Sequence, residues 1–161
     1  MLLACTRYGL IACRYLTEGY YGNRYIPAPE IAEKYNMNIR ALMPALRQLT
    51  RAGILRSRVG GTEPGFIFSR DPETISMLEI LSALEGNLKI TCCREIIKGL
   101  KCDCHSKEHC VILSLLGNLF DQGKSNLSRL SIKDHALKAK ENELSKDIDS
   151  GSSQSDYQYK K

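Results

Sequence analysis

PAPEIAEKYNMNIRALMPALRQLTRAG, residues 27–53, is the stretch that decides the fold. Pro29 suits the first turn of a helix that runs to about Tyr35. Residues 36–38, Asn-Met-Asn, predict a turn whose last Asn caps a second helix over residues 39–52, and Gly53 ends that helix. Two short helices joined by a three-residue turn indicate a helix-turn-helix.

The second of these helices has two different faces. Its apolar residues recur at intervals of three and four and predict a buried face: Leu42, Ala45, Leu46 and Leu49. Arg40, Arg47 and Arg51 fall on a separate line, on which Pro44 also lies. Three guanidinium groups on one ridge can reach phosphates or a guanine edge in the major groove. A solvated helix face without a DNA partner is the alternative interpretation.

Two strand-like runs follow directly, ILRSRV at 54–59 and GFIFS at 65–69, with the loop GGTEP between them. A helical pattern over residues 4–18 precedes the helix-turn-helix, so the order of elements is that of a winged helix. The predicted wing begins with two arginines. The DNA-binding residues that we expect are Asn38, Arg40, Arg47, Arg51, Arg56, Arg58 and Thr62.

Composition limits the classes of protein that remain. The chain has 161 residues, 43% of them hydrophobic, which supports a buried core and excludes wholesale disorder. It contains no apolar run near the roughly 20 residues of a membrane span. Seven cysteines are too few for a disulfide-dense miniprotein, so we expect a cytoplasmic protein with reduced thiols. Residues 1–70 hold ten basic and four acidic groups, a net charge of +6, whereas residues 71–161 hold thirteen basic and fourteen acidic groups, a net charge of −1. This asymmetry is expected of a nucleic-acid-binding domain joined to a separate module.

The C-terminal half predicts a sensor and dimerisation module. A helix over about 75–85 is followed by a cysteine-rich segment and by a long amphipathic helix from about His109. Its apolar stripe from Ile112 to Leu130 is broader than a small domain can cover, which favours a homodimer, although packing within one chain is the alternative. Ser131 and Asp134 can cap a last short helix. We expect three parts: a winged-helix DNA-binding domain (1–70), a helix, sensor loop and dimerisation helix (71–137), and a disordered tail (138–161).

Four stretches together resemble a known family: RYGL at 7–10, LTRAGIL at 49–55, Gly65-Phe66 in the wing and ISMLEILSALEG at 75–86. Over residues 4 to about 135 the chain resembles the Rrf-two family of bacterial transcription regulators, of the IscR, NsrR and CymR type. The resemblance implies a dimer that binds promoter DNA, with a mainly α fold and a small β wing. The chain departs from the family pattern at Glu63 and Pro64 in the wing and at Met43 and Pro44 in the second helix of the motif, so the operator sequence does not transfer.

The resemblance also implies an iron–sulfur cluster, either 2Fe-2S or 4Fe-4S, held by three cysteines. Family spacing assigns Cys93, Cys104 and Cys110 as ligands, with Cys92 and Cys102 as possible substitutes. His105 and His109 are candidates for a fourth ligand. A thiol redox switch and a structural zinc site remain alternatives for this segment. Cys5 and Cys13, on the first predicted helix, are expected to be structurally inert.

The sequence therefore predicts a transcriptional regulator, a repressor, whose DNA affinity depends on an iron–sulfur cluster. The alternative is a regulator controlled by thiol redox chemistry or by a partner protein, without a cluster, whose winged helix docks a protein instead of DNA. We expect no enzyme. The three histidines at 105, 109 and 135 lie near no Gly-rich nucleophile turn, and the sequence contains no phosphate-binding loop.

Overall fold

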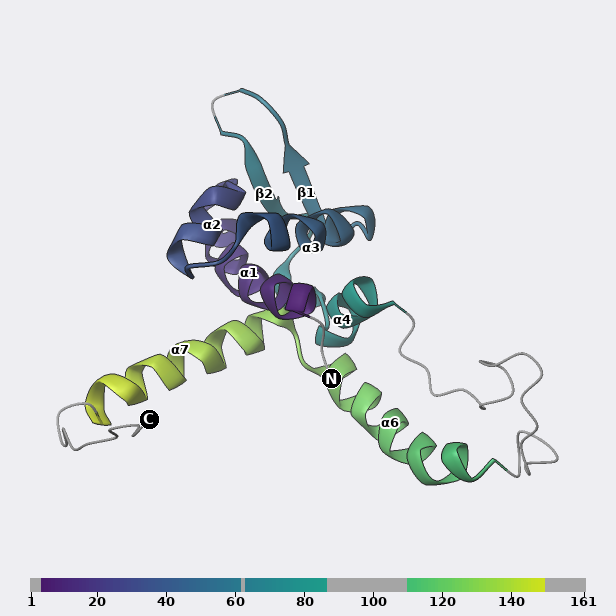
Figure 1. The fold of residues 1–161 in the computed structure, drawn as a ribbon. Helices are drawn as coiled ribbons and strands as arrows, with labels where there is room; N and C mark the ends of the chain where they lie inside the picture. Colours follow the sequence, from purple (N-terminus) through teal and green to yellow (C-terminus); the bar gives the residue numbers. More distant parts are fainter. Residues whose placement is uncertain (1–3, 62, 87–109, 150–161) are drawn as a thin grey trace, which may run out of the picture.

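The computed structural model describes residues 4–61, 63–86 and 110–149, and these form a mainly helical chain with one small antiparallel sheet (Figure 1). The elements follow in chain order: α1 (Ala4–Tyr21), α2 (Ala28–Lys34), α3 (Ile39–Arg51), β1 (Leu55–Arg58), β2 (Gly65–Phe68), a 3-10 turn η1 (Pro72–Thr74), α4 (Met77–Glu85), α6 (Val111–Arg129) and α7 (Ile132–Asp149). This architecture confirms the predicted fold class, a helix-turn-helix with a β wing. Within these ranges, no helix is both long and apolar enough to cross a membrane.

The turn between α2 and α3 forms from local interactions. Asn36 takes a left-handed backbone conformation (φ 49°), which Asn tolerates better than most residues. The N–H of Met37 donates to the carbonyl of Ala32 at 2.8 Å. The side chain of Asn38 then caps α3 by accepting from the N–H of Arg40 at 2.9 Å. The turn and the Asn cap are thus as the sequence predicts, and both depend on residues only a few positions apart.

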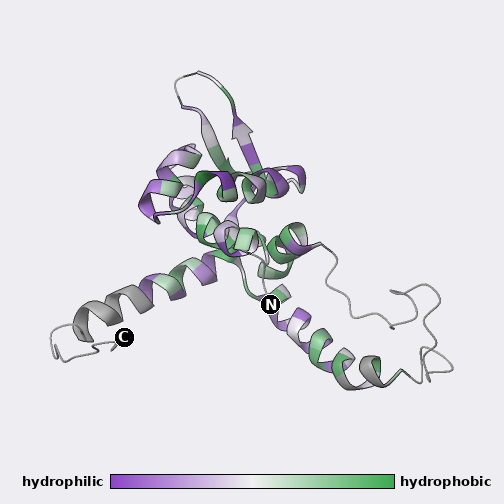
Figure 2. Cartoon of the chain, viewed as in Figure 1, coloured by the Kyte–Doolittle hydropathy of each residue, from purple (hydrophilic) through white to green (hydrophobic). Residues whose placement is uncertain are grey.

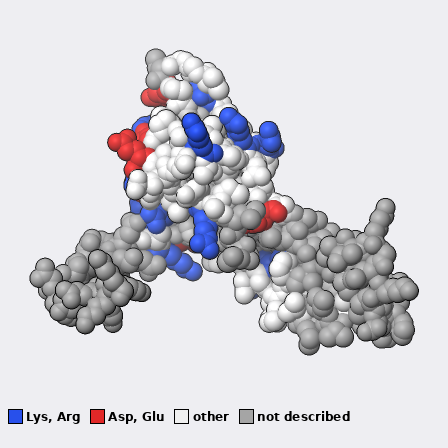
Figure 3. Space-filling model, viewed as in Figure 1, with Lys and Arg blue, Asp and Glu red and all other residues white. Residues whose placement is uncertain are grey.

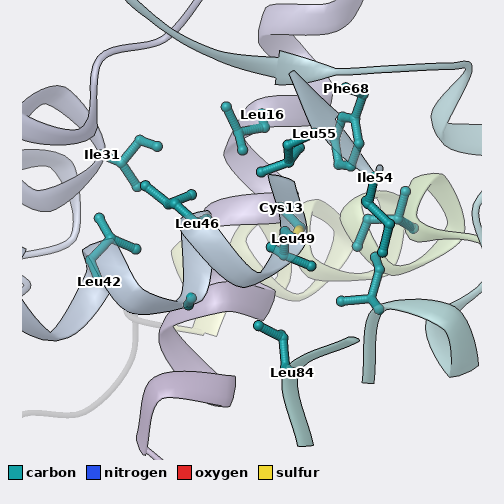
Figure 4. Packing of buried hydrophobic residues seen from close by; sticks show 14 of the residues in the cluster. Cys13, Leu16, Ile31, Leu42, Leu46, Leu49, Ile54, Leu55, Phe68 and Leu84 are labelled. Carbon is teal, nitrogen blue, oxygen red and sulfur yellow. The ribbon is translucent and has the colours of Figure 1, made fainter. Parts of the chain in front are cut away.

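The core gathers where α3 packs across α1, and its side chains converge from several elements in Figure 4. The predicted apolar face of α3 is fully buried: Leu42, Ala45, Leu46 and Leu49. Gly9 of α1 permits this packing, because a Cβ there would lie 3.3 Å from the Cβ of Ala45 and 2.7 Å from Cδ1 of Leu84. Each fully buried Leu contributes about 1.5–3 kcal/mol of transfer free energy. The packing therefore fixes which face of α3 remains exposed.

The wing is a two-stranded hairpin that is anchored at its base. Strands β1 and β2 pair antiparallel, from Leu55 opposite Phe68 to Arg58 opposite Gly65. Phe66 also exchanges two backbone hydrogen bonds with Ile26, both 2.9 Å long, just before α2. A Cβ at Gly65 would lie 2.5 Å from the carbonyl carbon of Ile26, so only glycine allows this close approach. The wing is thereby tied to the helix-turn-helix.

The last two helices meet beside the start of α4. The N–H of Met77 donates to the carbonyl of Leu130 at 2.7 Å, and the N–H of Ile132 donates to the carbonyl of Ile75 at 2.9 Å. Ser131 and Asp134 cap α7 reciprocally, as predicted, with the two backbone N–H bonds at 2.9 and 3.1 Å. From this junction α6 and α7 project in different directions (Figure 1). Figure 2 shows hydrophobic residues recurring along α6.

The C-terminal helix is longer than the sequence analysis suggests. The predicted disordered tail begins at residue 138, whereas α7 continues to Asp149. The physical reason is local, because residues 136–148 contain no Gly or Pro and are mostly Ala, Leu, Lys and Glu, all strong helix formers. Low apolar content was the wrong criterion for disorder in this stretch. The rest of the predicted tail, residues 150–161, lies outside the described residues.

The anchoring of the wing generates a prediction. Gly65→Ala should lower the free energy of unfolding by about 1–3 kcal/mol, because the new methyl group must push the backbone of Ile26 away. Urea denaturation followed by circular dichroism measures this. Gly22→Ala is the matched control, since its added Cβ lies 3.4 Å from the nearest atom, an ordinary contact. The control should change stability by less than about 0.5 kcal/mol, and equal losses in both variants would contradict the close approach at Gly65.

Candidate nucleic-acid interface

The face of α3 opposite the core carries the predicted arginines. Arg40, Arg47 and Arg51 are all exposed, as is Pro44 between them. Within the described part of the chain, no carboxylate forms an ion pair with any of the three. Figure 3 shows basic side chains gathered over α3 and the base of the wing, while acidic ones lie at α2, at the wing turn and beside α4. The ridge is therefore a concentrated, uncompensated positive surface.

Asn38 occupies a different place from the arginines. Its side-chain oxygen accepts the N–H of Arg40 at 2.9 Å and so caps α3. The structure thus assigns this oxygen to holding the start of the helix. A direct DNA contact by Asn38 remains a prediction that would use its amide N–H groups.

The wing arginines lie on β1, and the two have different neighbours. Both Arg56 and Arg58 are exposed. The guanidinium carbon of Arg58 lies 4.1 Å from the centroid of the Tyr25 ring, a cation–π contact that restrains this side chain. Tyr25 is a site residue that the sequence analysis missed, because nothing in the local pattern pairs it with a residue 33 positions away. Thr62, also predicted to contact DNA, lies outside the described residues.

A groove of about 660 Å³ separates α3 from the wing. Apolar and basic side chains line it together, among them Ile39, Met43, Arg47, Arg58, Val59 and Phe66. Arg51 also lines the groove, whereas Arg40 and Arg56 do not. The interface is thus an arginine ridge beside a partly apolar groove, and sequence spacing predicted only the ridge.

A polar cluster holds α2 at the edge of this interface. The Glu30 carboxylate accepts from Nη2 of Arg24 at 2.6 Å and from the Tyr15 hydroxyl at 2.8 Å. The Arg24 hydrogen bond is the main cause that holds the pKa of Glu30 below its ordinary value, and burial opposes it. Glu30 also raises the pKa of Tyr15, mainly by accepting its hydrogen bond. The cluster joins α1, α2 and the loop between them, and the ion pair with Arg24 neutralises the Glu30 carboxylate.

The predicted cluster ligands are described only in part. Cys93 and Cys104 lie outside the described residues, as do Cys92, Cys102, His105 and His109. Cys110 is buried and occupies the N-cap position of α6. Among the residues that the structure places, no three potential metal-ligating side chains gather at one point. Cys13 is fully buried, and burial raises the pKa of its thiol to about 12, which favours the unreactive protonated form.

Comparisons with known proteins agree with this fold. The Rrf2 family model, described as an iron-dependent transcriptional regulator, matches residues 3–137. One solved structure of similar fold is CymR, the global cysteine regulator of B. subtilis. It superposes with a TM-score of 0.67 at 21% identity, and the match covers 86% of this chain and 97% of CymR. IscR of T. potens gives a TM-score of 0.66 at 22% identity, covering 88% of this chain and 90% of that one.

A relative in sequence is the HTH-type transcriptional regulator BadM of Rhodopseudomonas palustris, 33% identical over 63 residues. That match covers 39% of this chain and 40% of BadM, so it spans less than half of either protein. The family model is the broader finding, since it extends from the first helix through the start of α7. The chain therefore belongs to the Rrf2 family of transcriptional regulators.

Proposed function

We propose that this protein is a bacterial transcriptional regulator that binds duplex promoter DNA through α3 and the wing. The observation that carries the proposal is the exposed ridge of Arg40, Arg47 and Arg51, which no carboxylate of the described residues neutralises. The core fixes the opposite face of α3, so the ridge is presented without rearrangement. We further infer that it is not an enzyme, and that it acts in the cytoplasm, where a bacterial promoter lies.

The ridge and the wing would contact DNA at different places. A recognition helix enters the major groove with its N-terminal residues toward the base edges. Arg40, in the first turn of α3, would then approach bases, while Arg47 and Arg51 are further along the ridge. Arg56 and Arg58 would approach the phosphates or the adjacent groove from the wing. Contacts to phosphate weaken steeply with salt because counterions return to the DNA.

The affinity for duplex DNA and its dependence on salt test the roles of these arginines. Arg47→Ala and Arg51→Ala should each weaken binding to a duplex. An arginine that contacts a base should cost about 1–3 kcal/mol of binding free energy, whereas one that contacts a phosphate should reduce the slope of log K against log salt concentration by about one unit. Fluorescence anisotropy with a labelled duplex over a range of KCl concentrations measures both effects. Lys138→Ala, which removes an exposed charge from α7, is the matched control and should leave the slope unchanged. Wild-type affinity together with a wild-type slope in both arginine variants would contradict the interface.

We also propose that two copies of the chain associate through α6. Leu116 is 47% exposed and Leu119 is 66% exposed on this helix. Leu130, at its end, is 36% exposed. Apolar side chains repeated along one helix that projects from the body favour a partner of the same kind (Figure 1). A dimer would also place two copies of α3 on successive turns of a palindromic site.

Leu116→Glu combined with Leu119→Glu should yield monomers, because four buried carboxylates per dimer would repel one another and lose their hydration. Analytical ultracentrifugation gives the mass, and circular dichroism checks that the fold remains. Asn118→Glu combined with Gln122→Glu is the control, since it adds the same charge at exposed polar positions of α6. A stable dimer of the leucine double variant would refute the role of α6.

For control of DNA affinity, we propose a cluster ligated by Cys93, Cys104 and Cys110. Cys110 is the N-cap residue of α6, and the helix dipole at that end favours a thiolate, which supports its assignment as a ligand. Thiolate sulfur is the donor that iron–sulfur clusters require. When bound, the cluster would supply a redox-sensitive link among the three cysteines. The chain's own contribution is the link from Cys110 through α6 to Leu130, which holds the start of α4.

Anaerobic purification should give protein with visible absorption, iron and sulfide, and the Cys93→Ala, Cys104→Ala, Cys110→Ala triple variant should lack all three. The two forms should differ in duplex affinity by about 5–150-fold, the usual range of coupling between sites. Cys5→Ala is the control and should retain the wild-type spectrum. Wild-type protein without iron would favour the alternative, a thiol-controlled regulator. The alternative is retained because CymR, which has a similar fold, is named a global cysteine regulator.

A further inference from the structure

An apolar strip runs beside the arginine ridge on the side of α3 that faces the wing. Ile39, the first residue of α3, is 38% exposed, and Met43 lies half-buried one turn later. Both line the groove between α3 and the wing. Val59, on the wing side of the same groove, is 96% exposed. Apolar groups grouped in one groove of a binding face indicate a ligand with apolar features of its own.

The charges around the strip identify the kind of ligand. Arg47, Arg51 and Arg58 line the same groove, and no acidic residue does so within the described part of the chain. The ligand must therefore combine negative charge with small apolar groups. Duplex DNA has both, because its backbone is anionic and each thymine presents a C5-methyl group in the major groove.

The position of the strip on α3 is that of base recognition. Ile39 and Met43 occupy the first two turns, and N-terminal residues of a recognition helix contact base edges. Neither side chain can donate a hydrogen bond, and a thioether is only a weak acceptor. The thymine methyl is the apolar group among the base edges of the major groove.

We propose, on the basis of the DNA-binding function proposed above, that Ile39 and Met43 recognise thymine by contact with its C5-methyl group. Part of the base preference of this protein then comes from apolar burial, whereas the arginines supply hydrogen bonds and charge. Met43 is in this way a specificity-determining residue of this chain.

The experiment uses the full chain and removes single methyl groups from DNA. Wild-type protein selects duplexes from a random-sequence library, and the best duplex is resynthesised with one dT at a time replaced by dU, which lacks the methyl group. We expect dU to raise Kd about fourfold at one or more thymines of a half-site, the effect of losing one buried methyl group. Fluorescence anisotropy measures each Kd.

Protein variants then assign the methyl contact to its residues. Met43→Gln or Ile39→Ser should bind the dT and dU duplexes equally at the sensitive thymine, and Met43→Leu should preserve the difference. Leu137→Gln, an exposed apolar-to-polar change on α7, should keep the wild-type ratio. Tight binding with no sensitive thymine, or a wild-type ratio in both polar variants, would overturn this inference and leave the DNA-binding function intact. Failure to enrich any duplex would overturn both.

Discussion

Close packing of α3 on α1 at Gly9 is the contact on which the rest of the interface depends. At that point Ala45 of α3 and Leu84 of α4 both approach the α1 backbone, and a side chain larger than hydrogen would displace one of them. Protein interiors resist such displacement because they are packed as densely as organic crystals. The rotation of α3 about its axis follows from burial of its whole apolar face, Leu42, Ala45, Leu46 and Leu49. The arginine ridge faces solvent because it lies on the side of α3 opposite to that buried face.

The segment before α2 anchors the wing beside the helix-turn-helix. Ile26 holds the backbone of Phe66 by two hydrogen bonds, and the neighbouring Tyr25 contacts the guanidinium of Arg58. One short stretch thus anchors both the wing strand and a wing arginine. Helix α2 begins directly after this stretch, and its first residues line the groove between α3 and the wing. The Glu30 cluster holds α2 to α1.

The junction of α4, α6 and α7 places the C-terminal helices in contact with the same core. Leu130 and Ile132 bond to the backbone on either side of Ser76, and Ile132 is fully buried. Helix α4 in turn reaches Gly9 through Leu84. Contacts therefore run without interruption from α6 through α4 to α1 and α3. Such adjacency supplies a route along which a change at the start of α6 can reach the arginine ridge, provided that two arrangements of these contacts exist.

The sequence by itself determined the helix-turn-helix, the wing and the arginine ridge, because helical periodicity, caps and turns depend on residues a few positions apart. It also predicted the capping pair Ser131–Asp134, another local interaction. Tertiary structure alone decided the apolar groove, the Tyr25–Arg58 contact and the attachment of α7 to α4. These join residues that are distant in the chain, such as Tyr25 with Arg58, 33 positions away, and Ser76 with Ser131, 55 positions away. No local pattern encodes such pairs, since they form only when the apolar faces of several elements are buried together.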